Sequence, residues 1–140
     1  MNYLAYIFLF YWVVFLQGCS DNAIVNIFDK KITQNRIECM KLVLFPPDEK
    51  IEKTLKKLYS FDDSCAVKFE VSKKSGIVCN SNQNSQKKAL SNFPSSYLKM
   101  QISSNKIHYS YYIDLSDDVT SEDIKKAFAR IKKDIIIQKD

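Results

Sequence analysis

The strongest constraint on the fold is a pair of alternating segments, residues 97–102 and 107–115, separated by the polar residues 103–106. Successive side chains of a strand point to opposite faces of a sheet, so this pattern predicts an antiparallel hairpin with one apolar face. The predicted core face is Leu98, Met100, Ile102, Ile107, Tyr109, Tyr111, Ile113 and Leu115. The other face is Tyr97, Lys99, Gln101, His108, Ser110, Tyr112 and Asp114. We expect helices to cover the first of these faces.

Two segments with helical periodicity are suited to that role. The first, residues 47–60, opens with Pro47 and Asp48, which favour a first helical turn. Its apolar residues at helical spacing are Ile51, Leu55, Leu58 and Tyr59. The second begins after a capping residue, Thr120 or Ser121. Its apolar stripe is Ile124, Ala127, Phe128, Ile131 and Ile135.

Shorter alternating segments predict further strands at residues 37–45 and 66–71. Residues 72–76, which contain Gly76, predict a tight turn into a third segment at 77–79, and the polar run 80–88 predicts an exposed loop. The whole pattern predicts an α+β fold, an antiparallel sheet of about five strands with two main helices over one face. We expect residues 1–18 to be a leader, 19–36 a spacer ending in a first strand or turn, and 37–140 a single domain.

The apolar share of the whole chain, 46%, includes the expected leader, and the residues after it have roughly 40%, an ordinary fraction for a globular domain. Residues 1–18 contain no charged side chain, and the run from Tyr3 to Leu16 is entirely apolar. This run is shorter than the roughly 20 residues of a membrane-spanning helix. It is typical of the apolar core of a signal peptide.

The sequence Leu16-Gln17-Gly18-Cys19 resembles the lipobox of bacterial lipoproteins. The resemblance implies that Cys19 is acylated and becomes the new N-terminus, and that Ser20 after it directs the protein to the outer membrane. Gln17 departs from the small residue usual at its position, and the leader lacks an early lysine or arginine. Two alternatives stay open, cleavage after Ser20 and retention of the leader as an inner-membrane anchor. Each of them places the domain on the periplasmic side of the envelope.

The cysteines of an exported domain meet an oxidising compartment, so Cys39, Cys65 and Cys79 are candidates for one disulfide and one free thiol. In the hairpin predicted around Gly76, Cys79 lies roughly 10 Å along the strand from Cys65, too far for a bridge. Cys39 is therefore the expected partner of one of these two. With His108 as the only histidine and no closely spaced cysteine pair, we predict neither a metal site nor a cofactor.

Catalytic patterns are missing from the sequence, which has no Gly-rich phosphate loop and no Gly-x-Ser-x-Gly motif. The adjacent acids at 62–63 and 117–118 suit turns. His108, Ser110 and Asp114 share one predicted face, but Asp114 lies about 20 Å from His108 along an extended strand. They are too far apart for a hydrogen-bonded triad, and we expect the protein not to be an enzyme.

The net charge is +5, and all of it belongs to the part that follows the leader. Such a charge is a solvated surface, or it steers the domain toward an acidic protein or the anionic envelope. Nucleic acid is not an expected partner outside the cytoplasm. The candidate partner-binding residues are Tyr97, Lys99, Gln101, His108, Ser110 and Tyr112. Tyrosine is enriched at binding surfaces, although the same tyrosines also suit a purely structural strand.

In size, export signal and lack of catalytic residues, the chain resembles small periplasmic immunity proteins of bacteriocins, such as the pesticin immunity protein. The resemblance rests on organisation and not on a motif. It implies a plasmid-borne protein that binds and neutralises a peptidoglycan-degrading toxin. The alternative is a structural or assembly lipoprotein, a pilot or accessory subunit of a secretion or pilus system.

Overall fold

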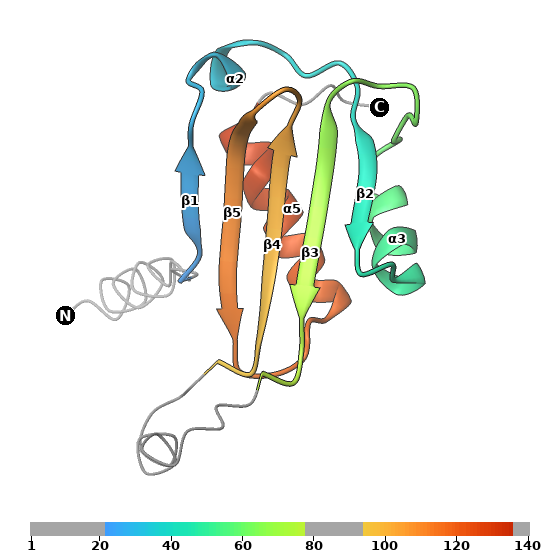
Figure 1. Cartoon of the computed structure of the whole chain (residues 1–140), viewed down its shortest axis with the longest axis vertical. Coiled ribbons are helices and arrows are strands. Elements are labelled where there is room, and N and C mark those ends of the chain that lie inside the picture. Colours follow the sequence, from blue (N-terminus) through green and yellow to red (C-terminus); the bar gives the residue numbers. More distant parts are fainter. Residues whose placement is uncertain (1–21, 78–93, 136–140) are drawn as a thin grey trace, which may run out of the picture.

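A five-stranded sheet forms the centre of the protein (Figure 1). The structure is a computed structural model, and it describes residues 22–77 and 94–135. The strands are β1 (Ile24–Ile27), β2 (Lys41–Phe45), β3 (Lys68–Lys74), β4 (Ser96–Ser103) and β5 (Ile107–Leu115). The helices are α2 (Lys31–Gln34), α3 (Glu49–Lys56) and α5 (Ser121–Asp134). These elements confirm the predicted α+β class.

The strand order is β1-β5-β4-β3-β2, and the sheet is mixed. β1 with β5, β5 with β4, and β4 with β3 are antiparallel, whereas β2 and β3 are parallel. A fully antiparallel sheet was therefore the wrong expectation. The helix α3 lies between β2 and β3 in the chain, and such a crossover carries the chain back so that the next strand runs in the same direction.

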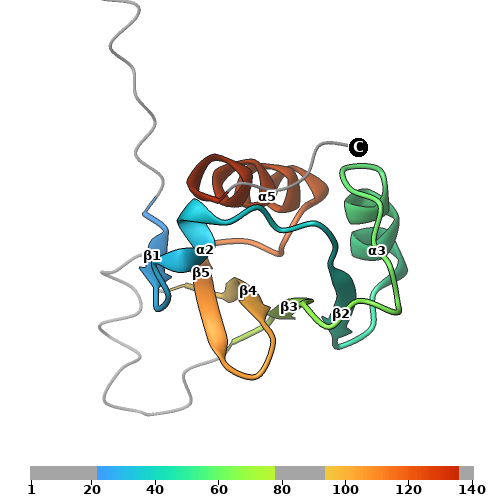
Figure 2. The same ribbon diagram turned by 90° about the horizontal axis from the view of Figure 1, so that it is seen from above.

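Both larger helices, α3 and α5, cover the same face of the sheet (Figure 2). The cap of α5 is Thr120, as expected, whereas Asp48 caps α3 instead of lying in its first turn, and α3 is shorter than the predicted helix 47–60. Asp48 accepts hydrogen bonds from the backbone N–H groups of Lys50 and Ile51, and Thr120 forms a capping box with Asp123. The apolar stripes of the helices meet the core face of the hairpin. The fully buried members of this core include Leu55, Phe69, Leu98, Met100, Ile102, Tyr109, Tyr111, Ile124, Phe128 and Ile131.

Ile107 is the exception on the predicted core face, because its side chain is 42% exposed. The pairing of β4 and β5 shifts register between Ile102 and Ser103, so Ile107 lies opposite Ser103. Ser103 follows Gln101 in the set of side chains that faces away from the helices. The irregularity therefore removes Ile107 from the row that the helices cover.

Two predicted segments can be compared with the strands observed. β1 lies within residues 19–36, where the spacer was expected to end in a first strand or turn, and it pairs with β5 along its whole length. β3 continues to Lys74, so the predicted turn at 72–76 starts too early. Gly76 does take a positive φ of 67°, but Ile77 then bonds through its N–H to the carbonyl of Ser95 instead of returning along β3. Cys79 and the predicted loop 80–88 lie outside the described residues.

A disulfide joins Cys39 and Cys65, with 6.0 Å between the Cα atoms. Cys39 precedes β2 and Cys65 precedes β3, so the bridge closes the crossover that contains α3. The structure thus settles the choice that the sequence left open for Cys39. Among the helices of residues 22–77 and 94–135, none has the length and apolar character needed to cross a membrane.

Candidate protein-binding face

The side of the sheet turned away from α3 and α5 is the candidate site, and we call it the open face (Figure 2). Its first row of cross-strand neighbours is Ile24, Tyr112, Lys99, Ser72 and Phe45. The adjacent row is Asn26, Ser110, Gln101, Glu70 and Val43. Asp114, Tyr97 and Lys74 extend the face at one end, and Lys41 and Lys68 at the other.

Most of the predicted binding residues gather here. Lys99 lies opposite Tyr112, and Gln101 lies opposite Ser110. The rings of Tyr97 and Tyr112 stack with centroids 5.6 Å apart. Ser110 belongs to the face by register but is only 6% exposed, so it supports its neighbours more than it offers a contact. The tyrosine pair and Lys99 form the accessible centre of the site.

A hydrogen bond fixes the orientation of Tyr112. Its hydroxyl donates to Oδ1 of Asp114 at 2.7 Å. This bond, helped by partial burial, raises the pKa of Tyr112 to about 12, because the phenolate would face a carboxylate. The folded state therefore favours the neutral phenol. Its contribution to stability is present below the unfolded pKa of about 10 and is lost as the pH rises through about 12.

Replacement of Asp114 by asparagine is expected to lower the pKa of Tyr112 toward about 10, the value for an unperturbed tyrosine. The measurement is a pH titration of the tyrosine Cζ resonances by carbon NMR. Asp117→Asn, which removes the same charge from the next connection, is the matched control and is expected to leave the Tyr112 midpoint in place. An unchanged midpoint in Asp114→Asn would contradict the role of this hydrogen bond.

The outer strands add exposed apolar side chains to the open face that were not among the predicted binding residues. Phe45 at the end of β2 is 76% exposed, and Ile24 in β1 is 57% exposed. Phe45, Pro46, Ser72, Lys74 and Tyr97 line a hollow of about 490 Å³ at one end of the face. The alternation of β2 did contain a signal that Phe45 belongs to the open face. Phe45 lies on the same side of the strand as Lys41 and on the opposite side from the buried Met40.

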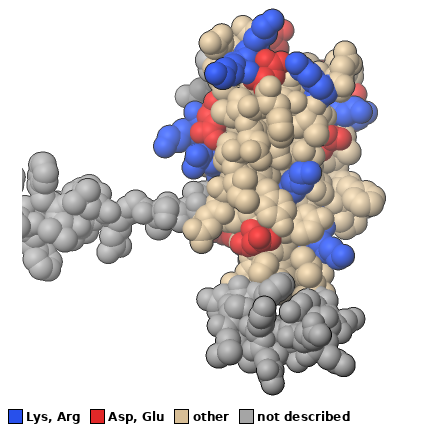
Figure 3. All heavy atoms as spheres, turned by 60° about the vertical axis from the view of Figure 1, so that its left-hand side comes forward, with Lys and Arg blue, Asp and Glu red and all other residues tan. Residues whose placement is uncertain are grey.

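The apolar surface continues around the β1 edge. Ile27 and Phe28 at the end of this strand are 44% and 63% exposed. Seen from the β1 side, the surface is largely free of charged side chains in its middle, whereas lysine, arginine and acidic side chains crowd its upper end (Figure 3). An uncharged area bordered by charged groups is typical of surfaces that bind other proteins.

His108 does not join the Tyr97–Tyr112 centre. Its Nδ1 lies 3.3 Å from Oδ2 of Asp29, and its Nε2 lies 2.7 Å from Oγ of Ser104. His108 and Asp114 thus bond to different groups, since Asp114 accepts the hydroxyl of Tyr112. The partner of His108 is instead Asp29, which sequence spacing gave no means of finding.

The Ser104–His108–Asp29 chain has the atom order of a catalytic triad, but its surroundings favour a structural role. Asp29 also contacts Nζ of Lys106 at 3.1 Å and accepts the backbone N–H of Lys31 at 3.0 Å. The Lys31 hydrogen bond, followed by the Lys106 contact, lowers the pKa of Asp29. The backbone N–H of Ser104 is donated to the carbonyl of Lys106, so it is not available to stabilise an oxyanion. The chain fastens the β1–α2 connection to the β4–β5 hairpin.

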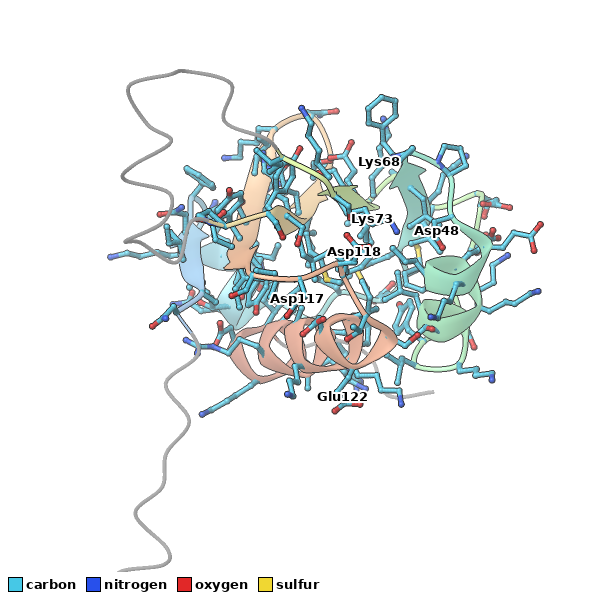
Figure 4. The ribbon with its side chains drawn as sticks, turned by 90° about the horizontal axis from the view of Figure 1, so that it is seen from below. Asp48, Lys68, Lys73, Asp117, Asp118 and Glu122 are labelled. Carbon is cyan, nitrogen blue, oxygen red and sulfur yellow. A yellow bond between two sulfur atoms is a disulfide. The ribbon has the colours of Figure 1, made fainter. Side chains whose placement is uncertain are left out.

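Both pairs of adjacent acids, 62–63 and 117–118, lie in connections between secondary-structure elements. Oδ1 of Asp62 accepts hydrogen bonds from both the N–H and the hydroxyl of Ser64, as expected for a turn. Asp117 and Asp118 lie in the connection between β5 and α5 (Figure 4). Within the described residues, no group of three or more His, Cys, Asp or Glu side chains is placed to hold a metal ion.

Comparison of the chain with protein-family models, with curated proteins and with solved structures finds no match in any of the three.

Proposed function

We propose that this protein is an immunity protein, which binds a peptidoglycan-degrading toxin on the periplasmic side of the envelope and neutralises it. The observation that carries the proposal is the open face, a five-stranded surface with an accessible tyrosine pair and all its larger helices on the other side. The protein would act by occlusion. A rigid surface covers the substrate cleft of the toxin and needs no chemistry of its own.

The geometry of the open face supports tight binding. Protein interfaces of ordinary strength bury about 800 Å² on each partner, and a few aromatic or basic residues near the centre supply most of the affinity. Tyr97 and Tyr112 offer a large contact area with few rotatable bonds, so little conformational entropy is lost on binding. Their stacking and the hydrogen bond to Asp114 hold them in place before a partner arrives. Preorganisation of this kind increases affinity.

The test combines protection and binding. The gene is expressed in cells challenged with the product of a neighbouring toxin gene, and binding of the two purified proteins is measured by calorimetry. We expect protection, and we expect Tyr112→Ala to weaken binding at least tenfold while the domain stays folded. Lys53→Ala on α3, whose ammonium group lies 3.5 Å from Glu49 at an exposed site, is the control that leaves binding unchanged.

Four results would count against this proposal. Absence of protection against any toxin encoded nearby would remove the immunity role, and loss of pili or secretion on deletion would support the assembly role instead. Unfolding of Tyr112→Ala would place Tyr112 in the core and not in a contact surface. Normal binding by a folded Tyr112→Ala variant would mean that the toxin binds a surface other than the open face.

The proposed location depends on Cys19, which lies outside the described residues. We expect Cys19→Ser to abolish labelling by radioactive palmitate and to release the domain into the periplasmic fraction. Cys79→Ser, which removes a thiol from another position outside the described residues, is the control and should leave the label in place. Unchanged membrane attachment of Cys19→Ser would instead support a leader that is retained as an anchor.

A further inference from the structure

We propose that the open face receives an acidic surface of its protein partner, with Lys99 as the central contact for a carboxylate. The inference rests on the proposal that this face is the binding face. It goes further in naming the chemistry of the partner.

The lysines of the open face form no ion pair with any of the described residues. Lys41 and Lys68 lie directly opposite each other on β2 and β3, and like charges in this arrangement destabilise a sheet. Lys74 and Lys99 lie toward the other end of the face. In the part of the chain that the structure describes, none of the ion pairs involves these side chains. Their charges are available to a partner.

Two lysines outside the open face have close acidic partners. On the helix side of the sheet, Nζ of Lys73 lies 2.6 Å from Oδ2 of Asp48, the residue that caps α3. Lys56 on α3 lies 2.6 Å from Glu52. Figure 4 shows Lys73 near Asp48 and Lys68 on the other side of the sheet. Among the residues that the structure describes, the four lysines of the open face have no such counter-ion.

The carboxylates of the open face are already engaged. Glu70 accepts a hydrogen bond from the hydroxyl of Ser103 at 2.6 Å. Asp114 accepts the hydroxyl of Tyr112 at 2.7 Å. Neither forms an ion pair with a lysine of the face. The lysines also outnumber these acids, so the face as a whole attracts negative charge.

Lys99 holds the best position among these lysines. It lies on β4, the central strand, directly opposite Tyr112, whose ring stacks on Tyr97. A partner that covers the two rings excludes water around the ammonium group, and a carboxylate then interacts with it more strongly than in open solvent. Glycosidases that cleave sugar polymers carry a pair of Asp or Glu side chains in the cleft. A toxin of that class presents the chemistry that Lys99 requires.

The experiment uses the full-length protein in a non-ionic detergent and poly-L-glutamate as the acidic probe. Binding is measured by titration at increasing concentrations of sodium chloride. We expect Lys68→Gln combined with Lys99→Gln to weaken binding at least tenfold at low salt. Lys125→Gln combined with Lys132→Gln on α5 removes the same charge from the opposite layer, and we expect a change of less than twofold. Lys99→Met, which keeps the apolar stem, is the second variant and should weaken binding without affecting the fold.

Equal losses in the two double variants would overturn the inference, because binding would then follow net charge alone. An unchanged affinity for the open-face variants would overturn it as well. Both results would leave the immunity proposal standing, since that proposal is tested by protection from a toxin. Conversely, a selective loss in the open-face variants without protection from any toxin would support the acidic contact and remove only the immunity role.

Discussion

Replacement of both Cys39 and Cys65 by alanine is expected to lower the free energy of unfolding by roughly 3.5 kcal/mol, the loop-closure value for the 26-residue separation between them. The closed loop contains β2, α3 and the segment that leads to β3. Without the bridge, the residues of this crossover have a higher conformational entropy in the unfolded chain. Parallel strands joined through a helix are a long-range pairing, so the disulfide stabilises the part of the sheet that is entropically most costly to assemble.

The measurement is equilibrium unfolding in guanidinium chloride, followed by circular dichroism. Both cysteines are replaced together, because a single replacement leaves a free thiol that can form other bridges. The wild-type protein unfolded in the presence of a reductant is the control and should match the double variant. A difference below about 1 kcal/mol between oxidised and reduced protein would contradict the expectation that the bridge constrains the unfolded chain.

Phe128→Ala is expected to destabilise the domain by about 4 kcal/mol, the usual cost of removing a large buried aromatic side chain. Phe128 is 1% exposed and lies between α5 and the sheet. Its ring meets that of Phe69 edge to face at 5.5 Å, and that of Tyr59 lies 6.4 Å away. Phe69 belongs to β3 and Tyr59 follows α3, so one side chain joins both helical segments to the sheet.

The same unfolding measurement tests this substitution. Lys125→Ala lies on the same helix, where its ammonium group forms an exposed contact with Glu122 at 3.8 Å, and we expect it to cost less than about 1 kcal/mol. A small effect of Phe128→Ala would mean that the sheet and α5 rearrange to close the cavity. Such a result would contradict the description of Phe128 as a central packing residue.

Local patterns in the sequence were sufficient to predict the elements with strong periodicity. The alternation from Tyr97 to Leu115 identified β4, β5 and, apart from Ile107, the side chains of their core face, and the stripe that includes Phe128 identified α5 together with its cap. Each of these signals depends only on neighbouring residues. The direction of β2 relative to β3 depends on where the α3 crossover returns the chain, which no local pattern records.

The short strand β1 shows a second limit of local patterns. Its four residues pair with β5, which is far away in the sequence, and only that pairing makes them part of the sheet. For the site, alternation predicted that Tyr97, Lys99 and Tyr112 share a face. Alternation also placed His108 with these residues, which was wrong. Its side chain contacts Asp29, which comes from a segment far away in the sequence.

The position of β1 would also limit the distance between the domain and the membrane if Cys19 carried the proposed lipid. Ile24, its first residue, follows Cys19 by five positions, and a fully extended chain of that length reaches at most roughly 18 Å. A lipid on Cys19 would therefore keep the edge of the sheet within this distance of the bilayer surface. Such a tether would join the outer strand β1, and it would leave the centre of the open face accessible. A toxin would then be intercepted in the thin layer next to the membrane.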